Sequence, residues 1–190
     1  PCFGSGYLLT AYCELEREHG SQPFGNEIDG EKFIIGFTRL LLSGAVPRLK
    51  NDDALNLTPD PLIPAVFGKT TPFSKTRMFD LVLANPPWAS RYKGHEELKD
   101  IFPEPTADTA GLFLQHALLK LRGEGLAVLI LPEGFFYKNS DRGLRKELVN
   151  NHDVKAIISL PNNVLPYTSI KPHILVVSKG GSTKKIRMIN

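Results

Sequence analysis

Residues 79–88 of this 190-residue chain read FDLVLANPPW. The apolar run that ends at Ala84 predicts a β-strand, and the prolines that follow predict its abrupt end. A proline fixes its own φ, has no N–H to donate and holds the preceding residue extended, so Asn85 and Pro86 are both pinned by the proline after them. The strand therefore ends in a stiff tip that presents two acceptors, the side-chain oxygen of Asn85 and the carbonyl oxygen of Pro86.

This tip matches the chemistry of a planar amino group, which offers two N–H donors to two acceptors. Trp88 adds a flat face on which a heteroaromatic ring can stack. A bare Asn-Pro pair is more simply explained as a turn after a strand. The apolar strand before it, the aromatic residue after it and a glycine turn upstream favour function here. We therefore predict that the catalytic element consists of Asn85, Pro86, Pro87 and Trp88.

Strands and helices alternate along the rest of the chain. Apolar residues at helical spacing predict helices over residues 7–19, about 31–42, 109–122 and about 141–151. Short apolar runs predict strands over residues 24–28, 46–49, 126–131, 154–160 and 174–178, with 186–189 as a short edge. Residues 58–76, rich in proline, threonine and lysine, predict a long surface loop. The alternation is typical of an α/β fold with a largely parallel sheet.

Ligands of such sheets bind at the carboxyl ends of the strands. The chain opens on a glycine turn, residues 4–6, where a ligand can approach the backbone closely beside the positive end of a helix. Glu27 lies at the end of the next predicted strand, about 20 residues on, where nucleotide-binding folds place a carboxylate that holds ribose hydroxyls. The alternative for Glu27 is a solvated acid at a strand end. Asp53 follows a further strand and suits an adenine amino group, with Asp52 as its competitor.

The composition argues against a disordered chain, a collagen-like repeat and a small disulfide-stabilised protein. With 42% hydrophobic and 23% charged residues, the chain can bury the core of one globular domain. Only Cys2 and Cys13 are present, which predicts idle thiols in a reducing compartment, the cytoplasm. No apolar run approaches the roughly 20 residues that a membrane helix needs. The net charge of +3 is compatible with a polyanionic partner without identifying one.

The five histidines do not have the spacing of metal ligands, so we predict no metal site. His116 falls on the apolar face of a predicted helix, and His173 precedes a buried-looking strand. Both are therefore predicted to be packed side chains and not catalytic ones.

The residues at the start and at the tip resemble a known pair of motifs. Residues 1–6, Pro-Cys-Phe-Gly-Ser-Gly, resemble the S-adenosyl-L-methionine (AdoMet) motif of amino-methyltransferases, and residues 85–88 resemble their catalytic Asn-Pro-Pro-aromatic tetrapeptide. Further stretches resemble the modification subunits of type I restriction-modification systems, which are N6-adenine DNA methyltransferases. These stretches are residues 25–28, 113–116, 131–134, 144–146, 158–161 and 174–179. The resemblance covers nearly the whole chain.

The resemblance implies a Rossmann-like AdoMet-dependent methyltransferase fold, with residues 1–190 as its catalytic domain. The chain lacks the acidic residue and the central strand that precede this motif in the family. We therefore expect a domain truncated at its N-terminus, without a target-recognition domain and inactive on its own. By the resemblance, Gly4 and Gly6 line the methionine portion of AdoMet, Glu27 holds its ribose and Asp53 its adenine. The full predicted cofactor-binding set is Pro1, Phe3, Gly4, Ser5, Gly6, Glu27, Ile28, Asp53 and Ala54.

The implied reaction is methyl transfer from AdoMet to the N6 amino group of an adenine extruded from DNA. Asn85 and Pro86 would accept hydrogen bonds from that amino group, and Trp88 would stack on the base. The implied partners are DNA, a specificity subunit and a restriction subunit, with no membrane. Arg91 and Lys93 would either contact phosphates or be solvated loop charges.

Two other functions remain open at this point. Methyltransferases with an Asn-Pro-Pro-aromatic tetrapeptide also modify guanine N2 in ribosomal RNA and glutamine side chains in release factors, because each target is a conjugated NH₂ group. A non-catalytic fragment kept for subunit assembly is the third reading, and the intact residues 85–88 argue against it.

Overall fold

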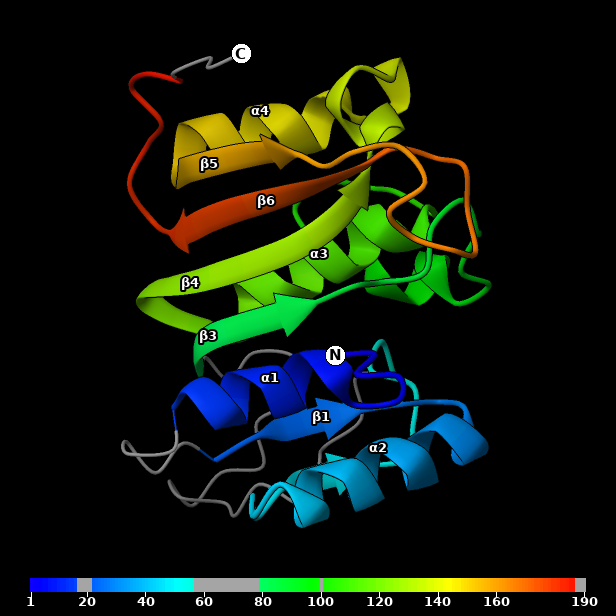
Figure 1. The fold of residues 1–190 in the computed structure, drawn as a ribbon. Helices are drawn as coiled ribbons and strands as arrows, with labels where there is room; N and C mark the ends of the chain where they lie inside the picture. The colour runs from blue at the N-terminus through cyan, green and yellow to red at the C-terminus, as the bar shows by residue number, and fades with distance from the viewer. Residues whose placement is uncertain (17–21, 57–78, 100, 187–190) are drawn as a thin grey trace, which may run out of the picture. The chain divides into compact units, whose positions relative to one another are not determined.

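The computed structural model describes residues 1–16, 22–56, 79–99 and 101–186. The chain divides into two compact units, Pro1–Ser74 and Lys75–Asn190, and Figure 1 labels their α-helices and all of their strands except β2. The predicted loop at 58–76 and all but the first residue of the predicted edge strand at 186–189 lie outside the described residues.

The first unit is a small parallel β-α-β arrangement preceded by a helix. Its elements are α1 (Tyr7–Leu15), β1 (Phe24–Asn26), α2 (Gly30–Leu42) and β2 (Arg48–Lys50). Strands β1 and β2 pair in parallel, with Phe24 opposite Arg48 and Asn26 opposite Lys50. Helix α2 begins at an N-cap, Asp29, whose side chain accepts hydrogen bonds from the backbone N–H groups of Glu31 and Lys32. The parallel pairing brings the carboxyl ends of both strands to one edge.

Close backbone packing in this unit requires two glycines. A Cβ atom on Gly6 would lie 2.9 Å from the Cα atom of Gly36, and Gly6 has a φ of +83°. A Cβ atom on Gly36 would lie 2.5 Å from the Cε2 atom of Phe3. Side chains at either position would push the opening turn away from α2.

The second unit is a four-stranded sheet with two helices and three short 3₁₀ turns among its described residues. Its strands are β3 (Phe79–Ala84), β4 (Leu121–Pro132), β5 (His152–Ser159) and β6 (Pro172–Lys179). Its helices are α3 (Thr109–Lys120) and α4 (Arg142–Asn151), with the turns η2 (His95–Leu98), η3 (Glu133–Phe136) and η4 (Asn139–Asp141). The strand order is β3-β4-β6-β5.

The direction of β6 differs from the largely parallel sheet expected from the sequence. Strands β3 and β4 are parallel, whereas β6 is antiparallel to both β4 and β5, so this sheet is mixed. A parallel return from β5 would need a crossover, usually through a helix. Residues 160–171, which connect β5 to β6, contain no helix, so β6 returns beside β5 in the opposite direction.

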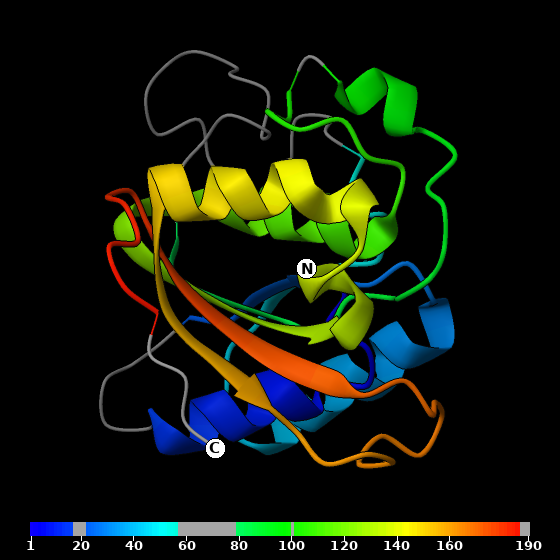
Figure 2. The ribbon, with the colours of Figure 1, turned by 90° about the horizontal axis from the view of Figure 1, so that it is seen from above.

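Helices α3 and α4 cover the same face of this sheet, as Figure 2 shows from above. Buried apolar residues alternate along three of the four strands: Val82 and Ala84 on β3, Ala127, Leu129 and Leu131 on β4, and Leu175 and Val177 on β6. Helix α3 is buried along nearly its whole length, including the polar side chains of Gln115, His116 and Lys120. The core of the unit lies between this sheet face and the two helices.

No helix among the described residues is both long and apolar enough to cross a membrane. Cys2 and Cys13, both among the described residues, form no disulfide bond. Burial raises the pKa of the Cys2 thiol to about 11, so it is protonated at neutral pH.

The N-cap of α3 provides a first testable prediction. Asp108 accepts hydrogen bonds from the backbone N–H groups of Ala110 and Gly111 at 3.0 and 3.3 Å. Asp108→Ala leaves these donors without their cap and is expected to lower the free energy of unfolding by about 1 kcal/mol, measured by urea denaturation. Asp108→Asn keeps an acceptor oxygen and should lose less. Equal stability of the two variants would contradict the capping role.

Candidate active site and cofactor turn

The predicted tip lies where the sequence places it, directly after β3. The strand ends at Ala84, and of the next residues Pro86 is buried, Asn85 and Trp88 are half-buried and Pro87 is exposed. The structure brings these four residues together at the carboxyl end of β3. This is the edge at which ligands bind in α/β sheets.

Trp88 is tied to the neighbouring strand through the edge of its indole ring. Its Nε1–H donates a hydrogen bond of 3.1 Å to the carbonyl oxygen of Ile130, near the carboxyl end of β4. The bond satisfies the polar atom of the indole and fixes the direction of the ring. Because Trp88 is only half-buried, it is not simply a core residue.

Thr109, at the first position of α3, holds the loop that follows the tip. Its hydroxyl donates to the carbonyl oxygen of Pro87 at 2.8 Å, and its backbone N–H donates to the carbonyl oxygen of Ser90 at 3.0 Å. Between them, Ala89 has a φ of +53°, in the left-handed region that non-glycine residues rarely adopt. Thr109 was not predicted from the sequence, because nothing in residues 79–91 indicates which later segment would anchor them.

The side chain of Asn85 also has a distant partner that was not predicted. Its Nδ2 atom donates a hydrogen bond of 3.0 Å to the hydroxyl oxygen of Tyr167, 82 positions along the chain. Tyr167 lies in the connection between β5 and β6. The one available signal was an aromatic residue in a segment that follows a strand, and this signal alone is too weak to select it.

In the first unit, Glu27 binds the opening turn directly. Its Oε2 atom accepts from the backbone N–H of Gly4 at 2.8 Å, and its Oε1 atom accepts from that of Asp29 at 3.0 Å. Glu27 is 7% exposed, so the alternative of a solvated acid at a strand end is wrong. An ionised carboxylate has about four acceptor sites, so these two bonds leave capacity for ligand hydroxyls.

The turn itself is held in a defined shape. Gly4 and Gly6 both have positive φ, +58° and +83°, which is the region that favours glycine. The Nε atom of Arg39 donates to the carbonyl oxygen of Ser5 at 2.9 Å, and its guanidinium lies 3.6 Å from the ring centroid of Tyr7. Helix α1 starts at Tyr7, so its unpaired N–H groups begin immediately after the turn.

The acidic pair after β2 consists of two residues with different surroundings. Asp52 forms an ion pair of 2.6 Å with Lys50, and this contact holds its pKa below the usual range. Asp53 accepts a hydrogen bond from the backbone N–H of Leu55. Because Asp52 is engaged by a cation, the geometry favours Asp53 as the candidate for a ligand amino group. Ala54 is buried, and Ile28 is 70% exposed.

Among the residues that the structure describes, no group of three or more His, Cys, Asp or Glu side chains could hold a metal ion. His116 is 3% exposed and lies against Phe113, with their ring centroids 6.4 Å apart. This confirms the prediction that it is a packed side chain.

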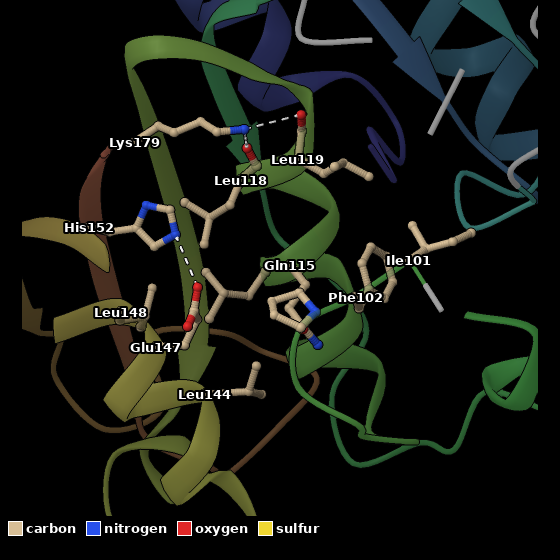
Figure 3. Close-up of a pocket in the computed structure, with 12 residues that line it drawn as sticks. Ile101, Phe102, Gln115, Leu118, Leu119, Leu144, Glu147, Leu148, His152 and Lys179 are labelled. Atoms are coloured by element: carbon tan, nitrogen blue, oxygen red, sulfur yellow. Dashed lines mark hydrogen bonds and ion pairs between the residues drawn. The ribbon is translucent and has the colours of Figure 1, made fainter. Parts of the chain in front are cut away.

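A cavity of about 240 Å³ lies elsewhere in the second unit, between α3 and α4 (Figure 3). Leucines of both helices line it, and polar atoms of Glu147, His152 and Lys179 lie at one side. The His152 Nε2 atom lies 4.0 Å from a Glu147 oxygen, and the Lys179 ammonium donates to carbonyl oxygens at the end of α3. None of the predicted site residues lines this cavity, so it is separate from the tip.

His116 provides a prediction about pH. Burial, followed by the nearby charge of Lys120, lowers the pKa of His116 well below its ordinary value of 6.5. The unfolded chain therefore binds a proton that the folded chain does not, so stability is lost as the pH falls below about 6.5. The loss attributable to His116 approaches about 1.4 kcal/mol per pH unit. His116→Leu is expected to flatten the fall in Tm between about pH 7.5 and pH 5.5; an unchanged slope would contradict this.

Comparison with known proteins supports a single family. The family model described as N-6 DNA Methylase matches residues 1–190. The methylase subunit of the type I restriction enzyme EcoEI from Escherichia coli is 30% identical over 97% of the chain. A solved protein from Vibrio vulnificus YJ016, described as a type I modification subunit, is 28% identical over 96% of the chain, with a TM-score of 0.76.

A solved protein from Listeria monocytogenes, described as a class I S-adenosylmethionine-dependent methyltransferase, shares the fold, with a TM-score of 0.75 over 98% of the chain at 19% identity. The predicted Rossmann-like methyltransferase fold is confirmed. The chain covers 38% of the Escherichia coli subunit, 40% of the Vibrio protein and 55% of the Listeria protein, so it spans only part of each.

Proposed function

Because the chain belongs to the N-6 DNA methylase family, we propose that it carries the methyl-transfer site of a type I modification subunit. The reaction we propose is transfer of a methyl group from AdoMet to the N6 amino group of an adenine in DNA. The S–CH₃ bond of the sulfonium breaks to leave a neutral thioether, and the methylated nitrogen releases one proton to water. The observation that carries the proposal is the stiff tip at residues 85–88, anchored to β4 by Trp88 and to α3 through Pro87.

The opening turn fits AdoMet on structural grounds. A Cβ atom built on Gly4 would meet no atom of the described residues within 4 Å, so among them a ligand can approach the backbone there. Glu27 retains acceptor capacity for ribose hydroxyls beside that turn, and Asp53 offers a carboxylate for an adenine amino group. Ile28 and Ala54 flank these two acids, while Pro1, Phe3 and Ser5 complete the turn. When bound, AdoMet supplies an electrophilic methyl group on a sulfonium.

The residues of the tip act on the acceptor nitrogen. An exocyclic amine is a poor nucleophile because its lone pair is delocalised into the ring. The Oδ1 atom of Asn85 and the carbonyl oxygen of Pro86 accept its two N–H groups and favour the pyramidal, more positive nitrogen of the transition state. Pro86 and Pro87 keep these acceptors from moving away. Trp88 stacks on the extruded base and excludes water from one side.

We further propose DNA as the macromolecular partner, in a complex with a specificity subunit and a restriction subunit, as the relatedness to type I methylase subunits supports. We propose the cytoplasm as the compartment, because it keeps thiols such as those of Cys2 and Cys13 reduced. Arg91 and Lys93, in the loop after the tip, are candidates for phosphate contacts.

The test is transfer of a labelled methyl group from AdoMet by the full-length protein. Duplex DNA, ribosomal RNA and a release factor are offered as separate substrates, and the product nucleosides or peptides are separated by chromatography. Label recovered as N6-methyladenine supports the proposal. Label in guanine of RNA or in a glutamine, with none in DNA, would replace it by one of the alternative substrates.

A further inference from the structure

The carboxamide of Asn85 needs a specific orientation that the prolines of the tip do not supply. Prolines restrict backbone torsions, whereas the terminal torsion of an asparagine side chain is broad and roughly two-fold. A carboxamide turned by half a rotation presents N–H groups in place of its oxygen. Facing the N–H groups of a substrate amine, it would then place donors against donors.

The structure shows the carboxamide in one of these two orientations, with its nitrogen side hydrogen-bonded. The Nδ2 atom of Asn85 donates to the hydroxyl oxygen of Tyr167 at 3.0 Å. With the nitrogen side held on Tyr167, the Oδ1 atom lies on the other side of the carboxamide. In this orientation an acceptor, and not a donor, would face the N–H groups of a base bound on that side.

Tyr167 is well placed for this task because the segment that carries it is held at both ends. The backbone N–H of Leu160 donates to the carbonyl oxygen of Pro172, and that of Glu133 donates to the carbonyl oxygen of Lys171. Next to Tyr167, the backbone N–H of Thr168 donates to the carbonyl oxygen of Leu165 in a turn. The loop between the two paired strands therefore holds the Tyr167 hydroxyl in a defined position.

We propose that Tyr167 is a positioning residue for methyl transfer, which orients the Asn85 carboxamide so that its oxygen accepts from the substrate amino group. The inference rests on the proposed function, because it assigns Tyr167 a role in the same site. Tyr167 acts through Asn85 and need not touch the substrate.

The first experiment removes only the hydroxyl. Tyr167→Phe in the full-length protein is expected to lower kcat for DNA methylation roughly tenfold, the value of one well-placed hydrogen bond. The Kd for AdoMet and the Tm should stay unchanged, because Tyr167 is 68% exposed and its ring is retained. The matched control is Tyr137→Phe, which removes a hydroxyl of similar exposure, 66%, and should leave kcat unchanged.

The second experiment separates orientation from other effects of the hydroxyl. A carboxylate carries an acceptor on each side and needs no orienting partner. In an Asn85→Asp background, Tyr167→Phe is therefore expected to change kcat by less than about twofold. Equal losses in the wild-type and Asn85→Asp backgrounds would overturn the proposal.

A spectroscopic readout tests the contact without any activity. The side-chain amide signal of Asn85 in a ¹⁵N–¹H spectrum, assigned by its loss in Asn85→Asp, should move in Tyr167→Phe and stay in place in Tyr137→Phe. An unmoved signal would overturn the proposal even if the enzyme were inactive.

The activity assay distinguishes failure of the positioning role from failure of the proposed function. If the wild-type protein methylates DNA and Tyr167→Phe has the same kcat, only the positioning role of Tyr167 is overturned. If the wild-type protein methylates no DNA, the proposed function fails.

Discussion

Asn85→Ala is expected to lower kcat for DNA methylation at least roughly 100-fold, while the Kd for AdoMet remains within about twofold. The substitution removes one of the two acceptors that stabilise the positive, pyramidal nitrogen of the transition state. The loss of one preorganised group of this kind typically lowers kcat by about 10²- to 10³-fold. Cofactor binding should persist, because Asn85 belongs to the tip and the predicted AdoMet contacts lie in the opening turn.

Single-turnover kinetics with labelled AdoMet and calorimetric titration of AdoMet measure the two quantities separately. Asn150→Ala, at an exposed position of α4, is the matched control and should leave both unchanged. Equal losses of turnover and cofactor affinity would contradict the role of Asn85, because they would indicate damage to the fold or to the cofactor site.

Glu27→Ala is expected to raise the Kd for AdoMet roughly 100-fold. The carboxylate accepts from the backbone N–H groups of Gly4 and Asp29, so its removal leaves two donors unsatisfied beside the turn. Each such loss costs about 1–3 kcal/mol, and the proposed ribose contacts disappear with it. At saturating AdoMet, kcat should fall much less than affinity.

Glu27→Gln is an intermediate test of this prediction, because its side-chain amide retains one acceptor oxygen and loses the negative charge. Its Kd for AdoMet should lie between those of the wild type and Glu27→Ala. Glu31→Ala, at an exposed position in the first turn of α2, is the control for loss of a nearby carboxylate. An unchanged Kd in Glu27→Ala would contradict both the ribose contact and the need for an intact opening turn in AdoMet binding.

Strands defined by local signals were predicted more accurately than strands that depend on a neighbour. The strand at 79–84 was predicted with its observed bounds, because an apolar run and a pair of prolines define it locally. Strand β4 was predicted over 126–131 and extends over 121–132. Its early part contains Gly123 and Gly125, which weaken a strand on their own, and it pairs with β3 through Phe79 and Leu121.

Strand direction and side-chain burial were harder to predict, because both depend on residues far apart in the chain. The reversed direction of β6 was not predicted, since apolar periodicity identifies a strand without giving its direction. Glu27 was predicted as a candidate from its spacing. Its burial and its bond to Gly4 became visible only when residues 23 positions apart were brought together.

The amino-acid sequence alone specifies the local chemistry: the strand, the proline-stiffened pair of acceptors, the aromatic residue beside them, and the glycine turn with an acid one strand later. These features follow from torsional limits and periodicity within a few residues. How those groups are oriented depends on the folded chain, through Ile130 for the indole, Thr109 for Pro87 and Tyr167 for the Asn85 carboxamide. A side-chain rotation is selected by its hydrogen-bond partners, and these partners come from segments 22 to 82 residues away in the chain.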